Sequence, residues 1–257
     1  MSAEPVLQLT DVCKRFGGLL AIDGLSCVVR PGQIKALIGP NGAGKTTVFN
    51  LITAVHPATS GEIRVGGVLA NGATSHRVAS LGVARTFQNI ELFGNMTVLE
   101  NVMVGAHTRT RSGLVDAAFR LPRMRREELA MAEKAGEYLA LVGLGDIAPE
   151  REATSLPFGQ QRLLEVARAL AAEPRLLLLD EPAAGLSTAE TAQLGELVKR
   201  IRELGVTVLL VDHDMDLVME ISDEVLVLDH GVKIAEGPPR EVQRDPRVIA
   251  AYLGEEA

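Results

Sequence analysis

The sequence predicts an α/β protein whose core is a parallel sheet covered by helices on both faces. From Leu176 onward, short apolar strands alternate with helices, and this βαβα rhythm is typical of parallel sheets. A second observation is a glycine-rich loop at 39–46, which follows an apolar strand and precedes a helical segment. A strand, a glycine-rich turn and a helix in that order favour an anion-binding site at the sheet edge.

The elements can be assigned in order from apolar periodicity and turn residues. The N-terminal part predicts strands at 6–10, 25–29, 34–38 and 61–67, and a helix at 45–55. Between about 98 and 172 strand signals disappear, and helical spacing at 127–142 predicts a mainly helical subdomain inserted into the α/β body. The C-terminal part predicts strands at 176–179 and 207–211, helices at 189–204 and 215–221, and a hairpin of 225–228 with 232–235.

Composition and charge narrow the classes of function. The 257 residues are 47% hydrophobic and 23% charged, an ordinary balance for one globular domain spanning 1–257. A net charge of −7 argues against a nucleic-acid partner, which requires an electropositive face. No signal peptide is visible, and the apolar runs are far shorter than the roughly 20 residues that span a bilayer, so we expect a soluble chain that reaches a membrane through a partner. Cys13 and Cys27 lack metal-like or redox spacing, and we expect reduced structural thiols.

The strongest local signal is Gly39-Pro-Asn-Gly-Ala-Gly-Lys45-Thr46, which fits G-x-x-x-x-G-K-[ST] without a mismatch. Glycines let the backbone curl around phosphates and aim N–H groups at them, and the following helix presents its positive N-terminal dipole. Lys45 would reach the β- and γ-phosphates, and the Thr46 hydroxyl would bind Mg²⁺. The alternative is a glycine-rich turn with a fortuitous Lys-Thr pair, but the flanking strand and helix favour the phosphate loop. The motif by itself indicates nucleotide binding and not hydrolysis.

The stretch Leu176-Leu-Leu-Leu-Asp180-Glu181 is an apolar strand that ends in two acids. A buried parallel strand delivers its C-terminal residues to the sheet edge, where ligands of α/β proteins bind. Asp180 can there support the Mg²⁺ shell, and Glu181 can orient and deprotonate an attacking water. The alternative is that both acids cap the next helix. His213, after the strand 207–211, and Gln88 are by themselves ordinary polar residues.

Six strings occur in the order found in the ATP-binding cassette (ABC) family, and the resemblance covers nearly the whole chain. They are the phosphate loop, Thr86-Phe-Gln88, Leu156-Pro-Phe-Gly-Gln-Gln-Arg-Leu, Leu178-Leu-Asp-Glu-Pro182, Ala184-Gly-Leu-Ser187 and Val211-Asp-His213. One such string is weak evidence, whereas six in the right order are very specific. The branch that the sequence most resembles is that of branched-chain amino-acid transport, through Phe16-Gly-Gly-Leu-Leu-Ala-Ile-Asp, Ala84-Arg-Thr-Phe-Gln-Asn and Phe93-Gly-Asn-Met-Thr-Val-Leu-Glu-Asn.

The resemblance implies a P-loop NTPase fold of the ABC ATPase type. This fold has a mixed or parallel core sheet, an antiparallel β subdomain and an inserted helical subdomain that carries the signature motif. The implied activity is Mg²⁺-dependent hydrolysis of ATP to ADP and phosphate, coupled to transport across a membrane.

The family's functional positions map onto this sequence by motif. Phe16 stands where an aromatic side chain stacks on adenine, and Gln88 lies in the loop that senses the γ-phosphate and Mg²⁺ and touches the membrane partner. Glu181 matches the general base and His213 the γ-phosphate switch, and with Gln88 and Lys45 they form the expected catalytic set. The implied nucleotide contacts are Phe16, Gly39, Pro40, Asn41, Gly42, Ala43, Gly44, Lys45, Thr46, Thr47, Gln88 and Asp180, with Leu156, Phe158, Gly159 and Gln160 acting in trans. The implied Mg²⁺ ligands are Thr46, Gln88 and Asp180.

The resemblance also implies partners and a location. The signature segment, Leu156–Gln161, would cap a nucleotide held by a second ABC ATPase subunit, which makes a homodimer or a heterodimer. Two transmembrane permease subunits would hold the dimer at the cytoplasmic face of the membrane, and a periplasmic solute-binding protein would act indirectly. ATP binding would close the dimer, and hydrolysis would reopen it.

Two positions depart from the family's pattern. The signature normally has Ser at its second place, where this chain has Pro157, so a contact typically worth about 1.5–3 kcal/mol is absent. Ser187 stands where the family usually has Asp or Asn. Three interpretations of Pro157 remain open: a lineage variation compensated nearby, pairing with a different cassette so that one of two sites is weak, or an impaired transporter.

Other functions and features remain open from the sequence. The same site residues would serve an importer of urea or an amide, or a lipid exporter, because the solute never touches this chain. A soluble ABC ATPase acting on DNA or the ribosome, and a simple phosphotransferase, are less consistent with the motifs.

The apolar segment 90–97 matches the region that receives the permease's coupling helix, although core packing explains it equally well. The basic cluster Arg120, Arg123, Arg125 and Arg126 reads as a solvated helix face or a contact with anionic lipid.

Overall fold

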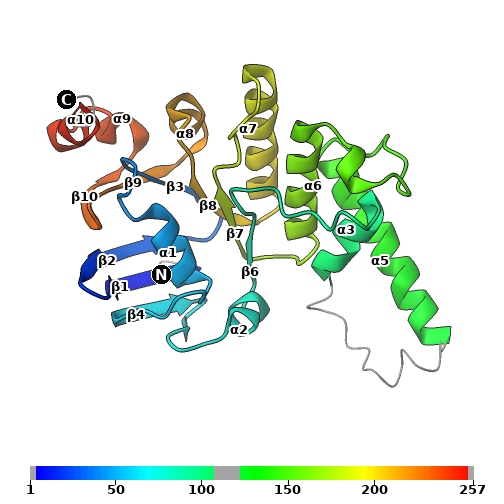
Figure 1. The fold of residues 1–257 in the computed structure, drawn as a ribbon, viewed down its shortest axis with the longest axis horizontal. Coiled ribbons are helices and arrows are strands. Elements are labelled where there is room, and N and C mark those ends of the chain that lie inside the picture. The colour runs from blue at the N-terminus through cyan, green and yellow to red at the C-terminus, as the bar shows by residue number, and fades with distance from the viewer. Residues whose placement is uncertain (1–3, 107–121, 254–257) are drawn as a thin grey trace. The chain divides into compact units, whose positions relative to one another are not determined.

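The computed structural model describes residues 4–106 and 122–253, drawn in Figure 1. The chain divides into two compact units. The first is formed by Met1–Arg85 and Arg175–Ala257, and the second by Thr86–Pro174.

A six-stranded sheet forms the centre of the first unit. Its strand order is β10-β9-β3-β8-β7-β6, and every pair except the antiparallel β10–β9 hairpin is parallel. The strands are β3 (Ile34–Ile38), β6 (Val83–Arg85), β7 (Leu176–Asp180), β8 (Thr207–Val211), β9 (Glu224–Asp229) and β10 (Val232–Gly237). Every residue of β3, β7 and β8 is buried, which explains why their sequences are apolar except for Lys35, Asp180 and Thr207. Their carboxyl ends share one edge, so the segments that follow them meet there.

A four-stranded antiparallel sheet, in the order β2-β1-β4-β5, belongs to the same unit. Its strands are β1 (Leu7–Phe16), β2 (Leu19–Val29), β4 (Ser60–Val65) and β5 (Val68–Leu69). The predictions of strands at 6–10 and 25–29 covered about half of β1 and β2. The two strands continue to a tight turn at Gly17-Gly18, where Phe16 pairs with Leu19 and Gly17 has a φ of 58°. The predicted spans were too short because Lys14 and Arg15 near the end of β1, and Asp23 and Gly24 within β2, interrupt the apolar alternation.

The helices of the first unit cover both faces of the six-stranded sheet. They are α1 (Lys45–Ile52), α2 (Ser75–Ser80), α7 (Thr188–Glu203), α8 (Met215–Ile221), α9 (Pro239–Val242) and α10 (Pro246–Leu253). Leu178, Leu209 and Leu226 share a core with α1 and the antiparallel sheet. The alternate residues Val208 and Leu210 face the other way, and α7 contacts β8 and α8 (Figure 1).

The helix predicted at 45–55 is shorter than expected. The α1 helix ends at Ile52, because the Thr53 hydroxyl donates to the Phe49 carbonyl at 2.8 Å and Ala54 turns left-handed with a φ of 55°. The predicted helix at 215–221 agrees with α8, and α7 lies within one residue of its predicted bounds at each end.

The second unit is helical in its described part. It contains α3 (Val98–Gly105), α5 (Pro122–Leu141), a 3₁₀ turn (Ala153–Ser155) and α6 (Phe158–Leu170), and these three helices contact one another. Gly105 lets α3 approach α6 closely, since a Cβ atom there would lie 1.9 Å from the Arg168 carbonyl oxygen. The basic cluster at Arg120, Arg123, Arg125 and Arg126 lies outside the residues whose side chains are described.

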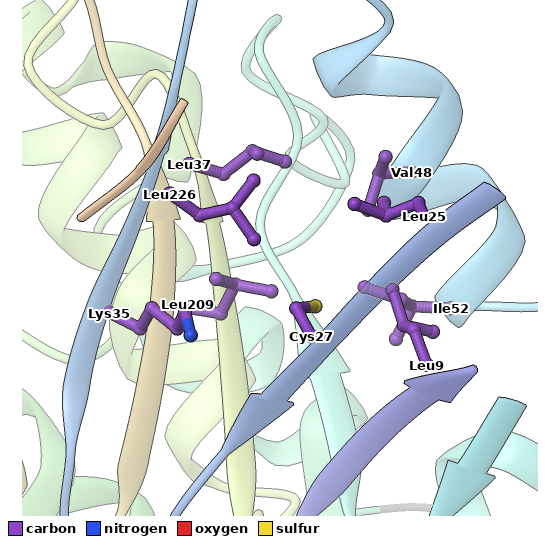
Figure 2. A pocket seen from close by; sticks show the side chains of 9 residues that line it. All are labelled: Leu9, Leu25, Cys27, Lys35, Leu37, Val48, Ile52, Leu209 and Leu226. Atoms are coloured by element: carbon purple, nitrogen blue, oxygen red, sulfur yellow. The ribbon is translucent and has the colours of Figure 1, made fainter. Parts of the chain in front are cut away.

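A small, mainly apolar cavity lies between the two sheets and α1 in the first unit (Figure 2). The Cys27 side chain points into it among leucines, and the buried Lys35 lines one side. Desolvation of the thiol, partly offset by the Lys35 ammonium, raises the pKa of Cys27 to about 11 from its ordinary value of 9.0.

We therefore expect Cys27 to resist thiol reagents in the folded protein. The thiolate is the reactive form, and this rise in pKa lowers its fraction at pH 8 about 100-fold. In a Cys13→Ser variant, a chromogenic disulfide reagent at pH 8 should react at least about 100-fold more slowly before unfolding in guanidinium than after it. The Cys27→Ser variant serves as the control that reports Cys13 alone. Equal rates for Cys27 in folded and unfolded chains would contradict the prediction.

Candidate active site

The phosphate loop 39–46 connects β3 to α1 and depends on its glycines. Gly39, Gly42 and Gly44 have φ angles of 148°, 78° and 104°, which side chains rarely adopt. Space is also limiting, because a Cβ atom on Gly39 would lie 2.0 Å from the Leu228 carbonyl oxygen and one on Gly44 would lie 2.9 Å from that of Ala21. The loop can therefore fold back against the neighbouring strands only with glycine at these positions.

Lys45 begins α1 and is held against the loop. Its side chain is buried, and Nζ donates to the carbonyl oxygens of Gly39 at 2.6 Å and Pro40 at 2.9 Å. Thr46, in the same first helical turn, is exposed. The N-terminus of α1, a lysine ammonium and an exposed hydroxyl together can bind a phosphate chain.

Arg85 connects the phosphate-loop helix to the acidic strand end. Asp180 is 2% exposed at the end of β7, and its Oδ2 accepts from Nη2 of Arg85 at 2.7 Å. Nη1 of the same guanidinium donates to Oδ1 of Asn50 at 2.7 Å, and Arg85 stacks on Phe49 at 5.4 Å, both on α1. Sequence reasoning did not single out Arg85. Arg85 ends the short edge strand β6, which pairs with the strand that ends in Asp180.

The structure brings Glu181 and His213 together at the same edge. Nε2 of His213 lies 3.0 Å from Oε1 of Glu181. Glu181 adopts a left-handed φ of 48°, and its N–H donates to the Val211 carbonyl at 2.7 Å, which fixes the residue against β8. The Glu181 side chain is 15% exposed and that of His213 51% exposed, so both can meet a ligand from solvent.

Asp212 ties together the segments that follow β7 and β8. Its Oδ2 accepts from the Ala183 N–H at 2.9 Å, and its Oδ1 accepts from the Asp214 N–H at 2.9 Å. Burial raises the pKa of Asp212, and these backbone donors offset part of that rise. Asp212 thereby holds together the two segments that carry Glu181 and His213.

Phe16 ends β1 and is 41% exposed. The Lys14 ammonium lies 4.7 Å from the centre of its ring, and the His56 ring meets it edge-on with centroids 5.2 Å apart. The Lys14 ammonium also donates to the Pro57 carbonyl at 2.8 Å. An aromatic ring held in this way offers a stacking surface for a flat ligand.

Gln88 and the signature segment belong to the second unit. Gln88 is exposed, and the carbonyl oxygens of Phe87 and Gln88 accept from the buried Arg162 at 2.8 Å each. In the signature segment the Leu156 side chain is buried, whereas Phe158 is 48% exposed. Gly159 and Gln160 follow in the first turn of α6 and are half-buried.

The two departures from the family's pattern both lie at helix starts. Pro157 occupies the position before α6, with a φ of −53°, and supplies no side-chain hydrogen bond there. Ser187 caps α7: its hydroxyl accepts from the Glu190 N–H, and the Glu190 carboxylate accepts from the Ser187 N–H at 2.9 Å. Ser187 therefore has a structural task as a helix cap.

Comparison with known proteins identifies the family. The model of the family described as "ABC transporter" matches residues 22–184, and that described as "Branched-chain amino acid ATP-binding cassette transporter" matches residues 232–257. The chain belongs to the ABC transporter family. It is thus an ATP-binding cassette and an ATPase, and the predicted family and fold class are confirmed.

Relatives and solved structures agree with this assignment along the whole cassette. It is 45% identical to the high-affinity branched-chain amino acid transport ATP-binding protein BraF of Pseudomonas aeruginosa, over 98% of this chain and 99% of that protein. It is 42% identical to LivG of Escherichia coli, with the same coverage. A nucleotide-free ATP-binding cassette from an ABC transporter superposes with a TM-score of 0.84 at 31% identity, covering 96% of this chain and 98% of that one.

A cassette of an ABC transporter in its ADP conformation also has a TM-score of 0.84, at 30% identity, covering 98% of this chain and 100% of the other. No helix within residues 4–106 and 122–253 combines the length and the apolar character needed to cross a membrane.

Proposed function

We propose that this cassette is the ATP-hydrolysing, energy-coupling subunit of an importer for branched-chain amino acids. The observation that carries the catalytic part is the Glu181–His213 pair, 3.0 Å apart at the sheet edge where the phosphate loop also begins. The substrate class is supported by the similarity to BraF and LivG, which are named for branched-chain amino acid transport.

ATP binding uses the phosphate loop and the aromatic platform. The ammonium of Lys45, which donates to the carbonyls of Gly39 and Pro40 in the structure, would exchange these acceptors for oxygens of the β- and γ-phosphates. Backbone N–H groups of residues 41–47 would bind the same phosphates, and the half-exposed Phe16 ring would stack on adenine.

The residues present fit Mg²⁺. Thr46 offers an exposed hydroxyl and Asp180 a carboxylate, which are the oxygen ligands that this ion prefers. The Arg85 bridge from Asp180 to Asn50 places the acidic strand end beside the helix that begins with Lys45 and Thr46. Gln88 is the third proposed ligand. When bound, Mg²⁺ neutralises charge on the phosphate oxygens.

Hydrolysis would use Glu181 as the general base. Its carboxylate accepts a proton from a water whose oxygen attacks the γ-phosphorus as the bond to the ADP oxygen breaks. His213 holds Oε1 of Glu181 and would contact the γ-phosphate from the neighbouring strand end. The left-handed backbone of Glu181 fixes the direction in which its side chain leaves the main chain, and the contact with His213 holds the carboxylate.

We further propose that the cassette acts as a dimer with a second ABC ATPase subunit, in which each signature segment caps the other subunit's nucleotide. Two permease subunits would bind the dimer at the cytoplasmic face of the membrane. The segment 90–97 would contact the permease, and a periplasmic solute-binding protein would deliver the amino acid.

Co-purification tests this proposal. A Glu181→Gln chain, which should trap ATP and the closed dimer, is expressed in its native host and purified from detergent-solubilised membranes with ATP and Mg²⁺. We expect two polytopic permeases and a cassette partner, whose sequences identify the solute class. Glu220→Gln, an exposed acid of α8, is the matched control that keeps turnover. Recovery with ribosomal or DNA-repair components would overturn the proposed role in transport. Recovery with permeases for another solute would overturn the assignment to branched-chain amino acids.

Replacing Pro157 by Ser tests whether one site of the dimer is weakened. A serine before α6 restores a hydroxyl donor toward the γ-phosphate and adds a helix cap worth about 1 kcal/mol. If the catalytic sites differ in strength, Pro157→Ser raises ATP turnover in the assembled complex and also the melting temperature. Unchanged or reduced turnover with the higher melting temperature would show that the proline does not limit catalysis.

A further inference from the structure

A buried ionic cluster on α6 forms hydrogen bonds with the main chain of the Gln88 loop, here defined as residues 86–91. The cluster consists of Arg162, Glu165 and Arg168, which follow the signature segment on one helix face. The Arg162 and Glu165 side chains are 1% and 0% exposed. Arg162 Nη1 lies 3.1 Å from Glu165 Oε2, and Arg168 Nη2 lies 3.5 Å from Glu165 Oε1. None of these three residues has a role in the hydrolysis described above.

Four hydrogen bonds run from this cluster to backbone atoms of the loop. Arg162 donates to the Phe87 and Gln88 carbonyl oxygens, each at 2.8 Å. The Glu91 N–H donates to Glu165 Oε1 at 2.8 Å, and Arg168 donates to the Glu91 carbonyl oxygen at 2.5 Å. The two ends of one guanidinium thus hold two successive carbonyls, a geometry that a lysine ammonium does not reproduce.

The cluster and the loop stabilise each other electrostatically. The cluster contains two cations and one anion, largely shielded from water. The carbonyl oxygens of the loop, which carry partial negative charge, balance the excess positive charge of the arginines. Burial raises the pKa of Glu165 and lowers that of Arg168, as expected where solvent cannot stabilise either charge. If the loop moved away, the arginines would lose these carbonyl acceptors and Glu165 would lose the Glu91 N–H.

We propose that Arg162 and Glu165 are positioning residues that fix Gln88 to the helix carrying the signature segment. Their effect on hydrolysis would pass through Gln88, whose carbonyl oxygen accepts from Arg162 and which is exposed. This inference rests on the proposed role of Gln88 toward the γ-phosphate and Mg²⁺.

A double-mutant cycle in the purified complex tests the inference. Arg162→Lys and Glu165→Gln are each made alone and in a Gln88→Ala background, and kcat, KM for ATP and melting temperature are measured. Lysine reaches one carbonyl instead of two, and the glutamine amide turns a donor toward an arginine. We expect each substitution to lower kcat about tenfold with KM for ATP little changed, as for the loss of an outer-shell partner. In the Gln88→Ala background the same substitutions should change kcat less than about twofold.

Controls and opposite outcomes separate this role from a structural one. Glu173→Gln, which breaks an exposed ion pair with Lys134 in the same unit, is the matched control for Glu165→Gln and should leave kcat unchanged. The inference would be overturned if kcat fell equally in the wild-type and Gln88→Ala backgrounds and the fall in kcat paralleled a fall in melting temperature. If Gln88→Ala alone leaves kcat unchanged, the proposed function of Gln88 is wrong, and the inference falls with it. Hydrogen exchange at the Glu91 amide, expected to be faster in Glu165→Gln, then tests the hydrogen bond between the cluster and the loop independently of kcat.

Discussion

ATP turnover should fall by a factor of about 10² to 10⁴ in Glu181→Gln, the loss expected when a general base is removed. Glutamine has the same shape, so the His213 contact at 3.0 Å and the left-handed φ of 48° can be kept. It does not accept the proton of the attacking water. ATP should therefore remain bound while phosphate release almost stops. Single-turnover hydrolysis of labelled ATP, with filter binding of the retained nucleotide, measures both quantities.

Two controls make this result specific. Glu220→Gln changes an exposed acid on α8 and should keep wild-type turnover. Lys45→Met should lose nucleotide binding itself, because the ammonium held at 2.6 Å from the Gly39 carbonyl would no longer reach the phosphates. If Glu181→Gln instead retains more than about a tenth of the wild-type rate, another group is the base.

The parallel sheet and the residues at its edge were predictable because their signals are local. Each of β3, β7 and β8 is buried throughout, and a strand buried on both faces is mainly apolar, here with Lys35, Asp180 and Thr207 as the exceptions. The phosphate loop is likewise encoded by consecutive residues. By contrast, the outer parts of β1 and β2 carry polar side chains such as Lys14 and Asp23, and their pairing depends on a tight turn and on neighbouring strands. Propensity over a short window does not report such pairing.

The interactions that hold the site were not predictable, because each joins residues distant in sequence. Arg85 and Asp180 are separated by 95 positions, and Arg162 and Phe87 by 75. In the sequence, Arg162 and Glu165 form an i, i+3 pair that is usual on a solvated helix face, yet both are buried. The site chemistry was therefore accessible from motifs, whereas the positioning of its groups required the three-dimensional contacts.

Gly39→Ala should destabilise the protein far more than Gly42→Ala, although both glycines lie in the phosphate loop with positive φ angles of 148° and 78°. An alanine Cβ at position 39 would lie 2.0 Å from the Leu228 carbonyl oxygen, which belongs to the backbone of β9 and has little freedom to move. No atom lies within 4 Å of the same position on Gly42. Steric overlap and backbone strain together should lower the free energy of unfolding by about 3–5 kcal/mol in Gly39→Ala, against about 1–2 kcal/mol from strain alone in Gly42→Ala.

Urea denaturation of the two variants measures this difference, with Gly72→Ala as a third case that has a φ of 71° and open space away from the loop. Because Gly39 begins the loop whose N–H groups would bind the phosphates, its displacement should weaken ATP binding as well, whereas Gly72→Ala should bind ATP normally. Similar losses for positions 39 and 42 would mean that backbone strain dominates and that β9 yields to the added methyl group. A larger loss of unfolding free energy in Gly39→Ala would instead establish that close packing against β9 holds the phosphate loop in place. The conformation of the loop would then depend on the neighbouring strand of the sheet as well as on the loop's own residues.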